Sequence, residues 1–150
     1  MPTLDYFFTV RLEDQTSSLL TKHFDLLRDA TLQAQQRRPF DIVSAVVLPN
    51  RIHTIWRLPE HDCDYAKRWK MIKTTFARRL PVAAQMKVRD SGKWLWQRRF
   101  WEQHITSQTQ MEECLAMIAQ SPVRAGLTLN ANRWRYATDA FSPLQIARAS

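Results

Sequence analysis

Segments with strand-like and helix-like hydrophobic patterns follow one another in a fixed order, and that order restricts the possible folds more than any other feature. Residues 6–12 are rich in aromatic and β-branched side chains, which is typical of a strand. After Thr16, a good cap residue, apolar positions recur at helical spacing up to Arg37 and predict one long amphipathic helix. Residues 42–48 and 51–58 indicate two strands joined by a Pro-Asn turn.

The second half of the chain adds a helix, a strand and a further helix. Asp64 is a good N-cap for a helix that Pro81 stops. The apolar stripe of this helix consists of Tyr65, Trp69, Ile72, Phe76 and Leu80. Residues 94–105 indicate a strand region. A capping box at Thr109 opens a short helix that we expect to end before Pro122.

The resulting order of elements predicts an α+β fold. Strand, helix, strand, strand, helix, strand is the order of the ferredoxin-like split β-α-β sandwich, whose antiparallel sheet carries its helices on one face. The last predicted helix is additional to that plan. We find no internal repeat, so residues 1–150 are expected to form a single domain with an irregular tail at about 130–150.

Composition excludes several classes of protein. With 150 residues, 45% of them hydrophobic, the chain can bury roughly two-thirds of its unfolded surface and needs no disulfides or structural metal to fold. Gly92 and Gly126 are the only glycines, too few for a phosphate loop or a dinucleotide-binding fingerprint, so no nucleotide cofactor is expected. Cys63 and Cys114 have no Cys-x-x-Cys partner, which argues against a structural zinc site. The N-terminus lacks a signal-peptide pattern and the longest apolar run, 42–48, is too short for a bilayer, so we expect a cytoplasmic protein.

The positive charge is concentrated in one part of the chain. The formal net charge is +8, but residues 51–101 contain 13 Lys or Arg and 4 Asp or Glu, a net charge of +9, together with five of the six tryptophans. Basic groups neutralise phosphates and aromatic rings stack on bases, so the mixture suits a nucleic acid with unpaired bases. A solvated basic face over a Trp-containing core is the alternative. Binding to a membrane surface is less favoured, because the charges are spread over several elements.

Four local strings carry a family resemblance. They are Val-Leu-Pro-Asn-Arg-Ile-His-Thr-Ile-Trp at 47–56, Arg-Trp-Lys-Met-Ile-Lys-Thr-Thr-Phe at 68–76, Arg-Arg-Phe-Trp-Glu at 98–102 and Ser-Pro-Val-Arg-Ala-Gly-Leu at 121–127. In this order, within a match over about 6–141, they resemble the REP-associated tyrosine transposases, a bacterial branch of the HUH single-tyrosine transposases. The resemblance implies a ferredoxin-like fold that binds single-stranded or hairpin DNA from palindromic repeats. It also implies cleavage with Mg²⁺ or Mn²⁺ and a tyrosine that forms a 5′-phosphotyrosine bond.

The positions that would carry this chemistry are mostly changed. Where the family has His-hydrophobic-His as metal ligands, this chain has Arg51 and His53, and a guanidinium has no lone pair for a metal. Alignment of the 121–127 string with the family's Asn-Pro-Val-Lys-His-Gly places Met117 at the nucleophilic Tyr and Ser121 at the third ligand, Asn. A thioether cannot attack phosphorus. The resemblance therefore predicts a degenerate site at which His53 is the surviving ligand and Mg²⁺ or Mn²⁺ binds weakly or not at all.

Our leading hypothesis from the sequence is DNA binding without cleavage. Arg51 is expected to pair with a phosphate near the former metal position, and a plain surface arginine at the hairpin turn is the alternative. Trp94 and Trp96 are expected to contact DNA, whereas Trp69 belongs to the apolar stripe. The other residues predicted to contact phosphates are Lys67, Arg68, Lys70, Lys73, Arg78, Arg98, Arg99 and Arg124.

Other interpretations remain open at this level. His53 can be a hydrogen-bonded structural histidine, and Met117 can simply fill space. Cleavage can be retained if Tyr136 or Tyr65 replaces the nucleophile. A different class of function is an RNA-binding or protein-interaction module on the same fold. The family favours a monomer, and a dimer is the alternative.

Overall fold

The structure is a computed structural model, and it describes residues 2–141. Its centre is a four-stranded antiparallel sheet with the order β2-β3-β1-β4. The strands are β1 (Thr3–Arg11), β2 (Asp41–Leu48), β3 (Arg51–Pro59) and β4 (Trp101–Ile105). The helices are α1 (Leu19–Lys22), α2 (Phe24–Arg37), α3 (Tyr65–Arg79), α4 (Val82–Asp90) and α5 (Gln108–Arg124). Short 3-10 turns are η1 (Glu60–Asp62), η2 (Ala131–Arg133) and η3 (Thr138–Phe141).

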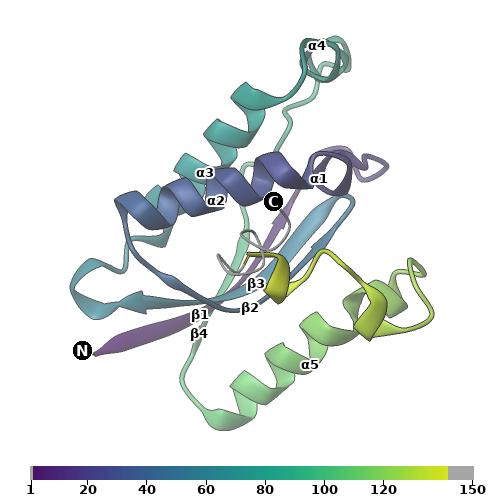
Figure 1. Cartoon of the computed structure of the whole chain (residues 1–150). Helices are drawn as coiled ribbons and strands as arrows, with labels where there is room; N and C mark the ends of the chain where they lie inside the picture. The colour runs from purple at the N-terminus through teal and green to yellow at the C-terminus, as the bar shows by residue number, and fades with distance from the viewer. Residues whose placement is uncertain (1, 142–150) are drawn as a thin grey trace.

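This topology confirms the ferredoxin-like prediction. Helices α2 and α3 lie side by side on one face of the sheet, and the additional helix α5 covers part of the opposite face (Figure 1). The β2–β3 hairpin and α3 occur within a residue or so of their predicted bounds, and the Asp64 carboxylate accepts a hydrogen bond from the Lys67 backbone N–H at 3.0 Å.

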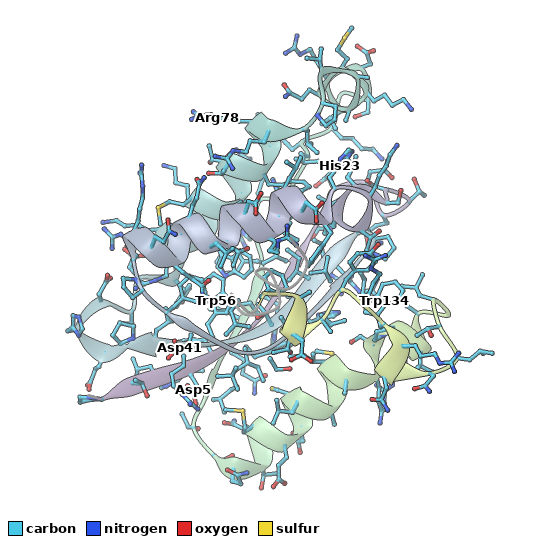
Figure 2. All side chains as sticks on the ribbon, in the orientation of Figure 1. Asp5, His23, Asp41, Trp56, Arg78 and Trp134 are labelled. Carbon is cyan, nitrogen blue, oxygen red and sulfur yellow. The ribbon has the colours of Figure 1, made fainter. Side chains whose placement is uncertain are left out.

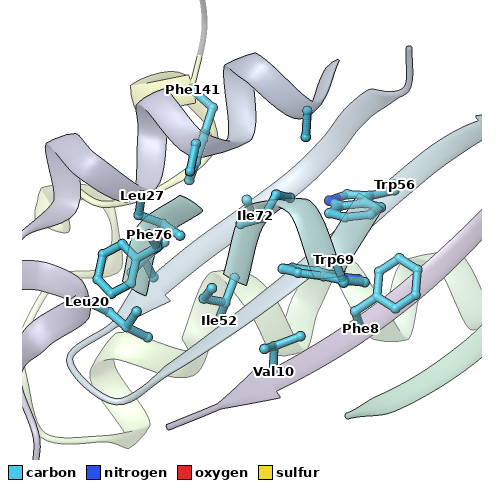
Figure 3. Packing of buried hydrophobic residues seen from close by; sticks show 14 of the residues in the cluster. Phe8, Val10, Leu20, Leu27, Ile52, Trp56, Trp69, Ile72, Phe76 and Phe141 are labelled. Carbon is cyan, nitrogen blue, oxygen red and sulfur yellow. The ribbon is translucent and has the colours of Figure 1, made fainter. Parts of the chain in front are cut away.

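The main core fills the space between the sheet and the α2/α3 layer. The Trp56 ring on β3 stacks on the Trp69 ring of α3 with centroids 4.3 Å apart, and Phe8 packs edge-on against both rings (Figure 3). Each such fully buried large side chain stabilises the fold by about 1.5–3 kcal/mol. Trp69 is therefore a core residue, as its place in the apolar stripe predicts.

A smaller core lies on the other face of the sheet, beneath α5. It joins Phe7 of β1 and Ile55 of β3 to Cys114 and Ile118 of α5. Alternate residues of β1 and β3 point to opposite faces, so the two cores divide each strand between them. The residues next to Phe7 and Ile55 on this face are Thr9 and His53, which lie at the border of the smaller core.

The N-terminal helical region and the segment after α3 differ from their predicted form. The expected single helix up to Arg37 is broken at His23, whose φ of −115° and ψ of 40° are not helical. Pro81 ends α3 as expected, but α4 begins immediately after it. Helix α4 has no buried residue, so its sequence carries little of the periodic apolar signal that marks α3.

The expected strand at 94–105 and the expected end of the last helix are also corrected. Only β4 is regular strand, while Trp96 forms an isolated bridge with Leu12. Helix α5 begins at a Ser107 cap and runs through Pro122 to Arg124. No helix among residues 2–141 is long and apolar enough to cross a membrane.

Candidate functional site

The first residues of β3 include two of the predicted site residues, and both lie on the α5 side of the sheet. Arg51 opens the strand and His53 follows two residues later, so both side chains point to the same face. That face is the one that packs against α5, because Ile55 belongs to the smaller core with Cys114 of α5. His53 is buried, with 6% of its surface exposed, and its ring lies parallel to Phe7 at a centroid distance of 6.3 Å.

Both ring nitrogens of His53 have hydrogen-bond partners. Nε2 lies 3.2 Å from Arg51 Nε, and Nδ1 lies 2.8 Å from Thr9 Oγ1. A guanidinium N–H can only donate, so His53 Nε2 is the acceptor. The ring proton is therefore on Nδ1, and this N–H donates a hydrogen bond to Thr9 Oγ1. Burial, with the nearby charges of Arg51 and Arg11, lowers the pKa of His53 to about 4. His53 is therefore a neutral imidazole whose lone pair is directed at Arg51.

Arg11 is the functional candidate that sequence reasoning missed at this end of the sheet. It is the residue directly opposite Arg51 in the β1–β3 ladder. Burial and the charge of Arg11 lower the pKa of Arg51, so the two guanidinium groups repel each other. The strand pattern alone places Arg11 at the end of a strand, but only the register shows that its neighbour is another arginine.

Helix α5 brings the other two predicted positions to the same side of the sheet. Met117 packs against the smaller core, and Ser121 is buried one turn later. The Ser121 hydroxyl donates to the Met117 carbonyl at 2.6 Å, an intrahelical bond. Arg51 and His53 on β3 and Met117 and Ser121 on α5 therefore lie on the same side of the sheet. The shared site that the family resemblance implies for them stays a prediction.

The residues present do not fit a divalent metal ion. Arg51 brings a fixed positive charge, the lone pair of His53 is used by Arg51, and Met117 offers only a soft thioether to a hard cation. Residues 2–141 contain no group of three or more His, Cys, Asp or Glu side chains that could hold a metal. The donor chemistry at this face therefore favours an anion over a cation.

Six of the residues predicted to contact phosphates are exposed. They are Lys67, Lys70, Arg78, Arg98, Arg99 and Arg124. Those on α3 lie in the α2/α3 layer, and Figure 2 shows Arg78 on that side of the molecule, away from α5. Arg98 and Arg99 occupy the sheet edge between Gln97, whose N–H donates to the Arg11 carbonyl, and Trp101, which is paired with Thr9. The structure therefore places the predicted cations on two sides of the sheet.

The prediction for Arg68 is wrong. Its side chain has no exposed surface, and its guanidinium donates to the backbone carbonyls of Arg38, Pro39 and Asp64 and to the Asp62 carboxylate. A guanidinium that is fully occupied inside the protein cannot reach a phosphate. Arg68 instead ties the end of α2 and the connection to β2 onto the start of α3.

Lys73 and Trp96 also have partners inside the protein. Lys73 Nζ lies 3.4 Å from the Gln97 carbonyl and 5.2 Å from the centroid of the Phe100 ring, and burial lowers its pKa. The Trp96 indole N–H donates to the Lys73 carbonyl at 3.2 Å. The two residues therefore join the segment before β4 to α3. Both stay partly exposed, and the DNA contact expected for them stays a prediction.

The exposed tryptophans are Trp94 and Trp101. Trp94 is 70% exposed and Trp101 is 63% exposed. The DNA contact expected for Trp94 stays a prediction. Trp101 lies at the end of the basic region 51–101, and sequence reasoning gave it no individual role. In the ladder it pairs with Thr9, which in turn pairs with His53, so its ring belongs to the face of the sheet that carries Arg51.

Neither alternative tyrosine lies beside His53 on this face. The Tyr65 ring packs against Phe8 in the main core, on the opposite face of the sheet, and a hydrogen bond with Glu102, together with burial, raises its pKa to about 12. Tyr136 packs against Phe24 of α2, and its backbone carbonyl accepts from the Val47 N–H. Neither tyrosine therefore shares the face of the sheet that carries His53.

Comparison with known proteins identifies the family. A REP-associated tyrosine transposase of Escherichia coli strain K12 is 35% identical over 133 residues, which cover 89% of this chain and 74% of the relative. A protein of Haemophilus influenzae with the same family name is 37% identical over 139 residues, covering 89% of this chain and 78% of the relative. No family model matches the chain.

A solved structure agrees with these relatives. The structure of a REP-associated tyrosine transposase bound to a REP hairpin superimposes with a TM-score of 0.77 at 33% identity, covering 97% of this chain and 81% of the other. Fold and sequence therefore point to the same group of proteins. The chain belongs to the REP-associated tyrosine transposases.

Proposed function

We propose that this protein binds hairpin DNA that carries an unpaired flank and that it does not cut the DNA it binds. The observation that carries the proposal is the hydrogen bond from Arg51 to His53, at the position where the family resemblance expects two metal-binding histidines. Arginine at position 51 cannot bind a metal, and its hydrogen bond occupies the lone pair of His53. It also adds a positive charge that suits a phosphate.

The binding half of the proposal is supported by family and by surface chemistry. The relative whose structure matches this chain is bound to a REP hairpin. Exposed cations and exposed indole rings lie along the edge that leads from the segment before β4 to the α5 face, including Arg98, Arg99, Trp94 and Trp101. Cations hold the DNA backbone and indole rings stack on unpaired bases, which explains the need for a flank.

The loss of cleavage is supported by the side chains at the site. Met117 replaces the nucleophile, and the Ser121 hydroxyl is bonded to the helix backbone. Tyr65 lies on the other face of the sheet with a raised pKa, and a phenol that resists ionisation is a poor nucleophile. Tyr6 and Tyr136, the other tyrosines of the chain, also pack against the main core, which argues against a substitute for the missing nucleophile.

A binding titration tests the proposal. Fluorescence anisotropy at moderate salt compares a labelled hairpin that has a single-stranded flank with random duplex DNA of equal length and with the matching RNA hairpin. We expect preferential binding to the DNA hairpin and a steep loss of affinity with salt. Equal affinity for random duplex, together with a shallow salt slope, would disprove DNA hairpin binding. Preference for the RNA hairpin would instead support the RNA-binding alternative.

A further inference from the structure

The β1–β3 ladder has complementary charges at one end and like charges at the other. Asp5 and Arg57 are directly opposite each other and form a two-pronged salt bridge with N–O distances of 2.9 and 3.0 Å. At the other end Arg11 and Arg51 are directly opposite, and among residues 2–141 neither forms a salt bridge. Like charges in directly opposed positions destabilise a sheet.

Arg51 is held in place by neutral groups. Its Nη1 donates to Asn50 Oδ1 at 3.0 Å, and its Nε donates to His53 Nε2 at 3.2 Å. Because a guanidinium N–H can only donate, His53 Nε2 accepts with its lone pair, and the imidazole in this hydrogen bond is uncharged. These partners orient the guanidinium without neutralising it, which leaves its charge available to an external anion. A planar guanidinium fixed in this way suits the paired oxygens of a phosphate.

The surroundings match a polynucleotide phosphate better than a free anion. Next to Arg11 the sheet edge carries the exposed residues Arg98 and Arg99. The exposed Trp101 pairs with Thr9, which is two residues before Arg11 and is the next residue on the same face. A backbone phosphate at the arginine pair would thus have a stacking surface for a neighbouring base within the same face.

We propose that Arg11 and Arg51 together hold one backbone phosphate of the bound DNA and do so without a divalent cation. This inference rests on the DNA binding proposed above. It assigns Arg11 a binding role and makes the affinity for hairpin DNA independent of metal. It also follows that the pair destabilises the free protein, because its mutual repulsion is relieved only when an anion is bound.

Charge-removing variants test the pair in the full-length protein. Arg11→Gln and Arg51→Gln each keep a polar side chain, and Arg37→Gln, at the exposed end of α2, is the matched control for net charge. In buffer with EDTA we expect each of the two site variants to bind the hairpin about 10- to 100-fold more weakly. The salt slope should fall by about one. The free site variants should melt at a higher temperature than the wild type.

The double variant adds a check that both side chains contact one phosphate. Its loss of affinity is then expected to be smaller than the product of the two single losses. If the wild type binds the hairpin but Arg11→Gln and Arg51→Gln bind like Arg37→Gln, the pair proposal is overturned and the DNA-binding function stands. Loss of wild-type affinity on addition of EDTA would also overturn it.

Inorganic pyrophosphate provides a probe that does not depend on hairpin binding. We expect it to raise the melting temperature of the wild type and of Arg37→Gln, but not that of Arg51→Gln. If the wild type bound no hairpin, the proposed function would fail. The pyrophosphate melting assay would then still test whether Arg11 and Arg51 bind an anion. An absent shift, or an equal shift in Arg51→Gln, would overturn the anion site.

Discussion

Acidification should destabilise this fold through His53. The pKa of His53 is lowered from 6.5 to about 4, first by burial and then by the charges of Arg51 and Arg11. Between these values the unfolded chain binds a proton that the folded protein does not bind, so the free energy of unfolding falls as pH falls. The difference of about 2.5 pKa units corresponds to about 3 kcal/mol, present above pH 6.5 and lost by about pH 4.

Urea unfolding from pH 7.5 to 4.5 measures this contribution. The control His53→Asn does not titrate in this range, and its amide N–H keeps a donor near Thr9. We expect the wild type to lose stability more steeply than His53→Asn between pH 6.5 and 4.5. Arg51→Gln, which keeps a donor for Nε2 but removes the charge, should show an intermediate slope, because burial remains the larger cause of the shift.

The histidine ring reports the same effect directly by NMR. A pH titration of the His53 ring signals should show no protonation at pH 6, and Arg51→Gln should raise the midpoint. Parallel stability curves for the wild type and His53→Asn, or an NMR midpoint near 6.5, would refute the assignment of His53 as a neutral acceptor from Arg51.

Three further variants test the packing and the binding surface. Arg68→Leu should lower the unfolding free energy by about 1–3 kcal/mol, because the carbonyls of Arg38, Pro39 and Asp64 and the partly exposed Asp62 carboxylate lose a donor, whereas Lys70→Leu should change it by less than about 0.5 kcal/mol. Equal losses in urea titrations would contradict the burial of Arg68. Trp101→Ala should weaken hairpin binding by about 5- to 100-fold at an unchanged melting temperature, as measured by anisotropy and thermal unfolding; unchanged affinity would exclude stacking. Asp64→Ala should lower the unfolding free energy by about 1 kcal/mol in urea titrations, since α3 loses its cap, and an unchanged value would show that the cap is dispensable.

Local patterns were enough to predict the central elements of the fold. The β2–β3 hairpin and α3 have strong apolar periodicity and clear end signals, and each forms close to its expected bounds. Helix α4 has no fully buried residue, so its sequence carries no clear apolar stripe. Pro122 normally ends a helix, yet α5 continues past it to Arg124. Pro122 and Ser121 are both buried, so packing overrides the local preference.

The site was harder to predict where its contacts join distant parts of the chain. The resemblance predicted one site from Arg51, His53, Met117 and Ser121. The structure has the first two on β3 and the other two on α5, which packs on that face of the sheet, and the roles expected for them stay predictions. The prediction that Arg68 contacts a phosphate failed because its hydrogen-bond acceptors include the carbonyls of residues 38 and 39, about thirty positions earlier in the chain. The role of Arg11 depends on the register of β1 against β3, which no local pattern encodes.

A cleavage assay on bound hairpin DNA tests the central claim most directly. Wild-type protein at a saturating concentration is incubated with an end-labelled hairpin and Mn²⁺, and the products are separated on a denaturing gel. The triple reversion Arg51→His, Met117→Tyr, Ser121→Asn serves as the comparison. With the wild type we predict that the DNA strand stays intact and carries no covalently attached protein. With the triple reversion we predict a cleaved strand and a covalent protein–DNA adduct. A covalent adduct formed by the wild type would contradict the account.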